Sequence, residues 1–392
     1  MIGEDTVTYM EKVSGDVELE DSSSGEVITH PFSPRDIKLT TPPMNLGDLI
    51  EMIQAGWINF NTEYQRSMNL WSPQQQSRLI ESVLLGLRLP AFYFEVIHQR
   101  KWNIIDGLQR CCAIMNFCVD KSLSLEGLEF LADFEGKSFD DLTFETRRDI
   151  RMLPITVNLL EPGAPDQVKY ILFKRLNTGG LELNSQEIRN AVYQGKPIDI
   201  VRELSEMDCF KQATCGKISS DRCLDMDFIS RFVAFYWLGY ENYQPDLDRF
   251  LNQSMEELRD YGTDERVVKM KQDFENAMQL SMDVFGDRAF RKQQCRDEYR
   301  RPINKAYFEV ISSQFALFSD EKRKAILGVK ELLVDNLHTA MRDSKSFQNS
   351  FSSGTGNRDA VKRRFTWFLD IVERSLSNIK IQINDDNRIE NM

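Results

Sequence analysis

The spacing of hydrophobic residues changes twice along the 392-residue chain. Large apolar residues are sparse before residue 40, follow both helical and strand spacing over residues 41–196, and follow almost only helical spacing over residues 197–380. This pattern predicts an α+β fold. A small mixed α/β core domain (41–196) should precede an all-helical domain (197–380).

The two ends of the chain lack such a pattern. The first thirty residues carry eight acids and one lysine, and a segment of this composition cannot bury enough apolar surface to order itself. We therefore expect an acidic flexible arm over residues 1–40 and a loose tail over residues 381–392.

Several elements of the core domain have clear start signals. A helix should begin after Ser72, because Ser72 is a favourable N-cap, Pro73 suits the first helical position and Gln75 completes a capping box. Apolar runs predict strands at 90–97, 102–105 and 155–160. Helical spacing predicts further helices at 44–56, 108–119, 167–176 and 184–195, and, in the second domain, at 228–237, 246–258, 267–284, 302–318, 321–341 and 360–377.

The sharpest turn in this pattern lies at Asp106 and Gly107, where a buried strand should pass directly into a helix that carries Gln109 and Arg110. Gly107 permits a backbone conformation that other residues avoid, and the start of a helix can bind an anion. Two interpretations remain open. Asp106 and Gly107 could merely cap and turn the chain, or the turn could hold a phosphate to which Arg110 adds charge-assisted hydrogen bonds.

A second polar motif follows the helix predicted at 167–176. It consists of Asn177, Thr178, Gly179 and Gly180 and, on the next helix, Glu187, Arg189 and Asn190. Polar residues and glycines of this kind are typical of a functional loop. The same residues could form a simple helix corner, in which Glu187 only caps the helix that Asn184 opens.

Composition narrows the chemistry. The net charge of −12 argues against a surface built for nonspecific nucleic-acid binding, although a local patch at Arg288, Arg291, Lys292, Arg300 and Arg301 could face DNA or could be an ordinary solvated face. Only His30, His98 and His338 could serve as imidazole ligands or bases. The seven cysteines have no CxxC spacing, no long apolar run predicts a membrane helix, and no signal peptide is evident, so we expect a cytoplasmic protein with free thiols.

Taken together, these motifs resemble the GmrSD-type restriction endonuclease N-terminal domain family. The resemblance rests on Tyr64-Gln65-Arg66, Leu79-Ile80-Glu81-Ser82, Asp106-Gly107-Leu108-Gln109-Arg110, Asn177-Thr178-Gly179-Gly180 and Gln186 to Ala191. Further motifs around Arg231, Asn304 and Gly354 extend it to about residues 44–370. It implies a core similar to ParB and sulfiredoxin, and a role in a bacterial restriction or antiphage system.

The resemblance also implies a site for a nucleoside triphosphate at the Asp106 loop, with Asp106, Gln109 and Arg110 as catalytic residues. Tyr64, Gln65, Arg66, Gly107 and the second motif would bind the nucleotide, and Asp106 would act through Mg²⁺ or a sugar hydroxyl. Arg66 could equally form an ordinary salt bridge. Glu187 could be a base or a metal ligand rather than a cap.

Departures from the family pattern limit the chemistry. Leu108 stands where the family usually has Gln, which bears on hydrolysis more than on binding. Sulfiredoxin-like enzymes place a reactive cysteine at that position, whereas Cys111 and Cys112 lie inside the predicted helix, so we expect no thiol chemistry. An HNH nuclease needs histidines that the C-terminal half lacks, apart from His338, so cleavage would need a separate nuclease or effector subunit.

Three functions therefore compete. The first is a nucleotide-binding sensor, expected to hydrolyse an NTP, that acts with DNA and an effector. The second is an interaction module gated by nucleotide without turnover, and the third is a DNA-binding adaptor whose Asp-Gly turn is structural. An oligomer is compatible with each of them.

Overall fold

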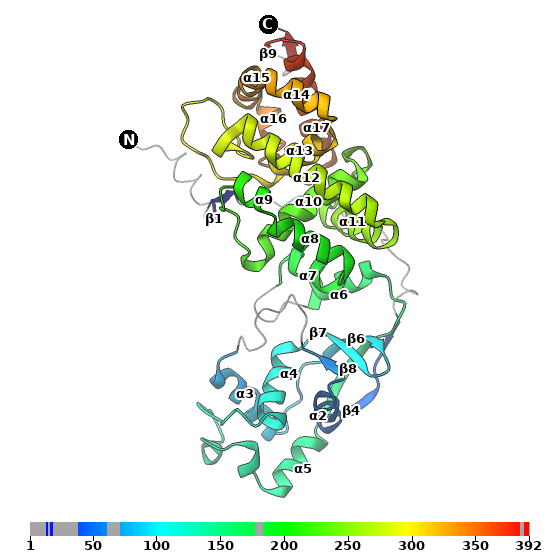
Figure 1. Ribbon diagram of the computed structural model, residues 1–392. Helices are drawn as coiled ribbons and strands as arrows, with labels where there is room; N and C mark the ends of the chain where they lie inside the picture. The colour runs from blue at the N-terminus through cyan, green and yellow to red at the C-terminus, as the bar shows by residue number, and fades with distance from the viewer. Residues whose placement is uncertain are drawn as a thin grey trace, which may run out of the picture. The chain divides into compact units, whose positions relative to one another are not determined.

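The computed structural model describes residues 13–14, 16–18, 38–60, 71–176, 183–384 and 388–391. The chain divides into two compact units (Figure 1). The core unit is His30–Val192, and the helical unit is Tyr193–Met392 together with Met1–Thr29. The division falls close to the predicted boundary at residue 196, and the α+β class is confirmed.

The core unit is built on a mixed sheet with the strand order β3-β8-β6-β7-β5, in which β4 also pairs with β8. Its strands are β3 (Leu39–Thr40), β4 (Pro43–Asn45), β5 (Ile58–Asn59), β6 (Phe92–His98), β7 (Lys101–Asp106) and β8 (Pro154–Leu160). β6 and β7 form an antiparallel hairpin, while β5–β7 and β6–β8 are parallel pairs. The predicted strands at 90–97, 102–105 and 155–160 are thus confirmed within a few residues.

The two faces of this sheet bury different apolar clusters, because side chains alternate along each strand. Phe92, Phe94 and Ile104 join the larger cluster with helices α2 (Leu46–Gln54), α3 (Pro73–Leu84), α4 (Leu108–Ile114) and α5 (Phe144–Met152). Ile105 and Leu160 join the smaller cluster with α6 (Asp166–Leu176) and α7 (Ser185–Val192). Figure 1 shows the two groups of helices on opposite sides of the strands.

The predicted capping box of α3 is present. Ser72 Oγ accepts from the backbone N–H of Gln75 at 3.2 Å, and Gln75 Oε1 accepts from the N–H of Ser72 at 2.9 Å. The helix predicted at 108–119 begins as α4 and continues as a π-helix over Met115–Val119.

The helical unit contains ten α-helices among its described residues. They are α8 (Lys196–Glu206), α9 (Asp208–Ala213), α10 (Leu224–Leu238), α11 (Leu247–Tyr261), α12 (Asp264–Phe285), α13 (Lys305–Leu317), α14 (Asp320–Gly328), α15 (Lys330–Asp343), α16 (Lys345–Asn349) and α17 (Arg358–Leu376). The single helix predicted at 321–341 is instead two helices, because the backbone at Val329 leaves the helical conformation.

The described parts of both chain ends differ from the expected flexible arm and loose tail. The short strands β1 (Val13–Ser14) and β2 (Val17–Glu18) pair with each other, and the N–H of Glu18 donates to the carbonyl of Ile303 at 2.9 Å. Val17 is buried, so an apolar side chain and main-chain hydrogen bonds offset the acidic composition. In the tail, β9 (Ile381–Ile383) pairs with β10 (Ile389–Asn391), and Ile381 is buried.

Candidate functional site

The turn at Gly107 has a conformation and a packing that only glycine satisfies. β7 ends at Asp106 opposite Tyr93 of β6, and Gly107 then adopts a left-handed φ of 103° before α4 begins. A Cβ atom on Gly107 would lie 2.7 Å from a ring carbon of Phe92. The passage from strand to helix predicted from the sequence is therefore present and sterically fixed.

Arg110 folds back over this turn and binds the carboxylate of Asp106. Its Nη2 lies 2.7 Å from Asp106 Oδ2, and its guanidinium also donates to the carbonyls of Pro90 and of Ala91, the latter at 3.2 and 3.3 Å. The guanidinium carbon lies 4.6 Å from the centre of the Phe92 ring. Arg110 thus clamps the ends of β6 and β7, and both of its Nη groups already have partners within the fold.

Asp106 remains reachable from solvent, because 31% of its side chain is exposed. Burial raises the pKa of this carboxyl above its ordinary value, although the charge of Arg110 opposes the shift. A carboxylate held in one orientation by Arg110, and still open to solvent, can accept a hydrogen bond from a sugar hydroxyl or coordinate a cation.

The neighbours of Asp106 on α4 have structural contacts. Gln109 Oε1 accepts from the backbone N–H of Trp71 at 3.2 Å, and this bond joins the start of α4 to the residue before the α3 cap. Leu108 packs against the larger apolar cluster. Cys111 and Cys112 are buried, and burial raises the pKa of both thiols, that of Cys112 to about 12, so both stay protonated near neutral pH.

On α7, Glu187 caps the helix. Its Oε2 accepts from the N–H of Asn184 at 2.7 Å, and Asn184 Oδ1 accepts from the N–H of Glu187 at 2.9 Å. Arg189 is fully buried and donates to Gln186, which in turn donates to Asn190 at 2.8 Å. The capping interpretation of Glu187 therefore has direct geometric support.

The smaller apolar cluster brings the two motifs into one neighbourhood. Ile105, which directly precedes Asp106, and Ile188, which lies between Glu187 and Arg189, belong to the same cluster. Asp106, Gly107, Gln109 and Arg110 therefore share a fold unit with the polar residues of α7. The remaining predicted ligands, Tyr64, Gln65, Arg66, Asn177, Thr178, Gly179 and Gly180, lie outside the described residues.

Sequence reasoning missed a row of polar side chains on the same face of the sheet. Asn59 donates to Asn103 at 3.0 Å and Asn103 contacts Glu95 at 3.5 Å, so the row crosses β5, β7 and β6 in register. Lys169 of α6 lies 2.6 Å from Glu95 and 3.0 Å from Asp166. Burial acts to lower the pKa of Lys169, but the carboxylates of Glu95 and Asp166 together raise it by more, so the pKa lies above its ordinary value. This network fastens α6 to the sheet, and polar residues at alternate strand positions were its signal in the sequence.

Residues 46–194 match the family model described as the N-terminal domain of the GmrSD restriction endonuclease. This part of the chain is a GmrSD-type N-terminal domain. The match contains the Asp106 turn, the polar row and α7. It ends before the helical half, to which the resemblance drawn from the sequence also extended. Searches among curated proteins and among solved structures returned no match.

The GmrSD-type domain offers few protein ligands for a metal ion. Over the described ranges of the chain, no group of three or more His, Cys, Asp or Glu side chains could hold one. Mg²⁺ commonly uses one or two carboxylates and completes its shell with phosphate oxygens and water. The Asp106 carboxylate has the chemistry of a single protein ligand of this kind.

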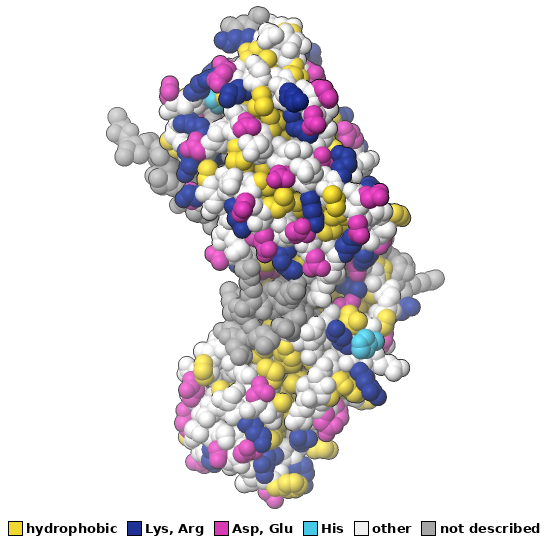
Figure 2. Space-filling model, in the orientation of Figure 1, with side chains coloured by type: hydrophobic (Ala, Val, Ile, Leu, Met, Phe, Trp, Pro, Cys, Tyr) yellow, Lys and Arg dark blue, Asp and Glu magenta, His cyan; other side chains and the backbone are white. Residues whose placement is uncertain are grey.

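Beyond the GmrSD-type domain, the predicted basic patch does not form a shared exposed surface. Arg291 and Lys292 are buried, and Lys292 lies 2.8 Å from Glu18. Arg300 and Arg301 pair with Asp287 and Glu298. Arg288 is half-buried. On the face shown in Figure 2, positive and negative side chains of the helical unit are interspersed, so the described geometry favours the alternative of paired charges.

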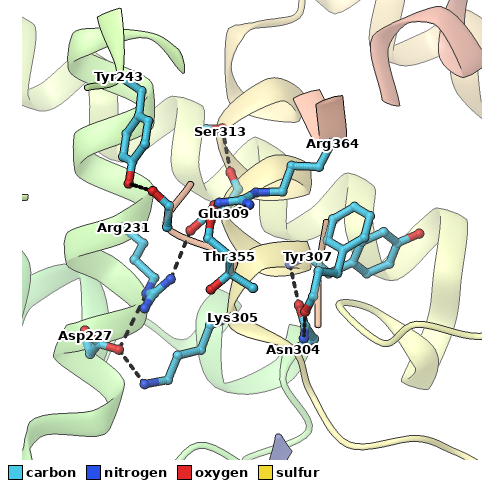
Figure 3. A network of polar contacts seen from close by, with 12 residues as sticks. Asp227, Arg231, Tyr243, Asn304, Lys305, Tyr307, Glu309, Ser313, Thr355 and Arg364 are labelled. Carbon is cyan, nitrogen blue, oxygen red and sulfur yellow. Dashed lines mark hydrogen bonds and ion pairs between the residues drawn. The ribbon is translucent and has the colours of Figure 1, made fainter. Parts of the chain in front are cut away.

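The motifs of the helical half converge instead on a buried ionic network around Glu309 (Figure 3). Glu309 is fully buried between Arg364 and Arg231, the latter at 3.1 Å. Arg364 also donates to the carbonyl of Thr355 at 2.7 Å, and Lys305 lies 2.8 Å from Asp227. This network joins α10, α13 and α17 to the polar loop before α17. The motifs around Arg231, Asn304 and Gly354 therefore have a shared structural role.

Among the described residues, no helix combines the length and the apolar character that a membrane span requires.

Proposed function

We propose that the GmrSD-type domain is the nucleotide-binding, regulatory part of a restriction or antiphage system, with its site at the Asp106 turn. The observation that carries the proposal is the Asp106 carboxylate itself. It is fixed by Arg110 on a turn that only glycine can make, yet remains open to solvent within a domain of this family. Such preorganisation is expected of a binding group and is not required of a helix cap.

In this proposal Asp106 contacts the nucleotide through Mg²⁺ or a ribose hydroxyl. Arg110 is a positioning residue, because its two Nη groups bind Asp106 and the carbonyls of Pro90 and Ala91. Contacts to the phosphates would come from the residues of the family motifs, Tyr64 to Arg66 and Asn177 to Gly180. The buried Arg189 and Asn190 would support that side of the site.

DNA and a separate nuclease or effector are the proposed partners. A chain with three histidines has little material for an HNH centre of its own, so nucleotide binding would regulate the action of another subunit.

A second candidate is a nucleotide-gated interaction module that does not hydrolyse its ligand. It is favoured by Leu108, which packs into the apolar cluster where the family usually has Gln, and by the engagement of Arg110. Binding would then shift the population of conformations without turnover.

Phosphate release with each of the four common ribonucleoside triphosphates separates the two candidates. The hydrolytic proposal predicts that the wild-type chain with Mg²⁺ releases phosphate well above the background of Asp106→Ala. Asp149→Ala is a matched control, because Asp149 is 70% exposed in the same unit. Release by the wild type at or below the Asp106→Ala level would contradict hydrolysis and leave the gating module.

A further inference from the structure

The helical unit contains a pocket of about 470 Å³ between the end of α12, the segment that follows it and the first half of α15. This volume lies in the range of small-molecule sites. The side chains that matter for its chemistry are Arg288, Arg291, Lys330, His338 and Tyr307, and all of them belong to this unit. The pocket is separate from the Asp106 turn of the GmrSD-type domain.

Arg291 gives the pocket its most unusual feature. The residue is only 3% exposed, and its Nη1 donates to the carbonyl of Arg301. Its Nε and Nη2 are buried, and neither has a hydrogen-bond partner in the described part of the chain. Burial, followed by the neighbouring charge of Arg300, lowers the pKa of this guanidinium. Buried charges are normally paired, so open donors here indicate a missing anionic partner.

Other cations add to the positive character of the pocket. Arg288 Nη1 is also buried without a hydrogen-bond partner among the described residues. Lys330 Nζ donates to the carbonyl of Asp283 at 3.3 Å. The lining also contains two acids. Glu331 is engaged by Arg296, which also lies 2.9 Å from Asp335, and Asp283 accepts from Gln279 at 3.0 Å. The pocket therefore has more positive than available negative charge.

The Glu309 network of the same unit provides a comparison. There the buried Arg231 and Arg364 both reach the carboxylate of Glu309, as Figure 3 shows. No ion pair within 4 Å is found for Arg291 across the described ranges, although it is as buried as Arg231. This unit thus neutralises its buried arginines elsewhere, and Arg291 is an exception at the wall of a cavity.

Part of the remaining wall is apolar. Val284, Phe285, Val334 and Leu337 line the pocket together with Tyr307. A ligand that satisfied both parts would combine an oxyanion for the arginines with a flat or apolar body for these side chains.

We propose that this pocket binds a small phosphorylated molecule whose phosphate contacts Arg291 and Arg288 and whose aromatic body packs against the apolar wall. Arginine suits this role because its planar fork of donors matches phosphate oxygens.

The test is calorimetric titration of the full chain, in an Asp106→Ala background that weakens binding at the other proposed site. The probes are the nucleoside monophosphates, the matching nucleosides and inorganic phosphate. We expect saturable binding of at least one monophosphate, with weaker binding of inorganic phosphate and none of the nucleoside. Inorganic phosphate binding as tightly as every monophosphate would overturn the aromatic-body part of the proposal.

Substitution then locates the ligand. Arg291→Gln should weaken binding about tenfold or more, because it removes charge-assisted hydrogen bonds. Arg259→Gln is the matched control, since Arg259 is exposed in the same unit and does not line the pocket, and it should change the affinity less than about twofold. Lys330→Gln serves as a second pocket variant if Arg291→Gln does not fold, as judged by circular dichroism.

His338 supplies a local readout, because it lies in the pocket and the chain has only two other histidines. Bound monophosphate should shift the imidazole resonance of His338 in the NMR spectrum. The resonance that is missing in His338→Gln identifies that signal. The proposal would be overturned if no phosphorylated probe bound. It would also be overturned if folded Arg291→Gln and Lys330→Gln both bound the monophosphate as tightly as the chain with the unchanged pocket.

Discussion

Gly107 is the residue on which the geometry of the Asp106 turn depends most directly. Its φ of 103° is a conformation that L side chains rarely adopt, and the ring of Phe92 occupies the space of a Cβ atom. Strain and steric overlap therefore act at the same position. The Asp106 side chain therefore cannot keep its position if Gly107 is replaced.

Gly107→Ala should lower the free energy of unfolding by about 2–4 kcal/mol, measured by urea denaturation, because it adds a steric clash to a strained backbone. Gly163→Ala is the matched control. Gly163 has a similar φ of 88° in the same unit, but no atom lies within 4 Å of its added Cβ. The control should cost only about 1–2 kcal/mol. Equal losses in both variants would show that the contact with Phe92 does not matter.

At the scale of single residues, the sequence predicted where a residue lies in the fold better than it predicted which groups that residue contacts. Asp106, Gly107 and the helix after them were expected where they are found. The carbonyls of Pro90 and Ala91, which engage Arg110, lie about twenty residues earlier and carry no side-chain signal. Whether Arg110 serves a ligand or the fold depends on such non-local contacts, so the spacing of residues alone cannot decide it.

At the scale of elements, Glu81 of α3 joins two parts of the core unit. Its carboxylate is buried and accepts from the backbone N–H groups of Glu129, Phe130 and Leu131 at 2.7–3.1 Å. Burial alone would raise the pKa of Glu81, but these hydrogen bonds and the charge of Arg78 lower it below its ordinary value of 4.5. This member of the Leu79-Ile80-Glu81-Ser82 motif therefore has a structural role.

Glu81→Gln should destabilise the chain by about 1.5–3 kcal/mol at neutral pH, because hydrogen bonds to a charged acceptor are lost. A lowered pKa in the folded state stabilises the protein above the unfolded pKa, and that stability is lost as the pH falls through the folded pKa. The difference between variant and wild type should thus shrink below about pH 4.5 in denaturation measured across pH. Glu129→Gln, at a half-exposed ion pair with Arg78, should cost less than about 1 kcal/mol. A pH-independent difference for Glu81→Gln would refute this role.

Local sequence signals predicted the helices and strands well, but they could not predict which distant segments pair with each other. The Ser72–Gln75 cap, the β6–β7 hairpin and the Asn184–Glu187 cap all depend on residues a few positions apart. The polar row of Asn59, Asn103 and Glu95 needs the strand register. The order of residues 16–18 needs Lys292 and Ile303, almost three hundred positions away, so composition alone indicated a flexible arm.

At the scale of the whole molecule, each unit has its own polar centre. In the core unit it comprises the Asp106 turn and the polar row, and in the helical unit the Glu309 network and the Arg291 pocket. Most buried charges in these centres are paired within the chain, which offsets the cost of removing them from water. The Asp106 carboxylate and the Arg291 guanidinium stand apart, because the first is open to solvent and the second is buried with no ion pair among the described residues. The two proposals therefore concern different units and can fail separately.

The central claim is that the Asp106 turn binds a nucleotide. Isothermal titration of the full chain with each nucleoside triphosphate and Mg²⁺ tests it most directly, with Asp106→Ala as the site variant and Asp149→Ala as the exposed control. We predict saturable binding of at least one triphosphate to the wild type and the control, and affinity about tenfold lower or worse for Asp106→Ala. Absence of binding by every triphosphate, or unchanged affinity in Asp106→Ala, would contradict the claim.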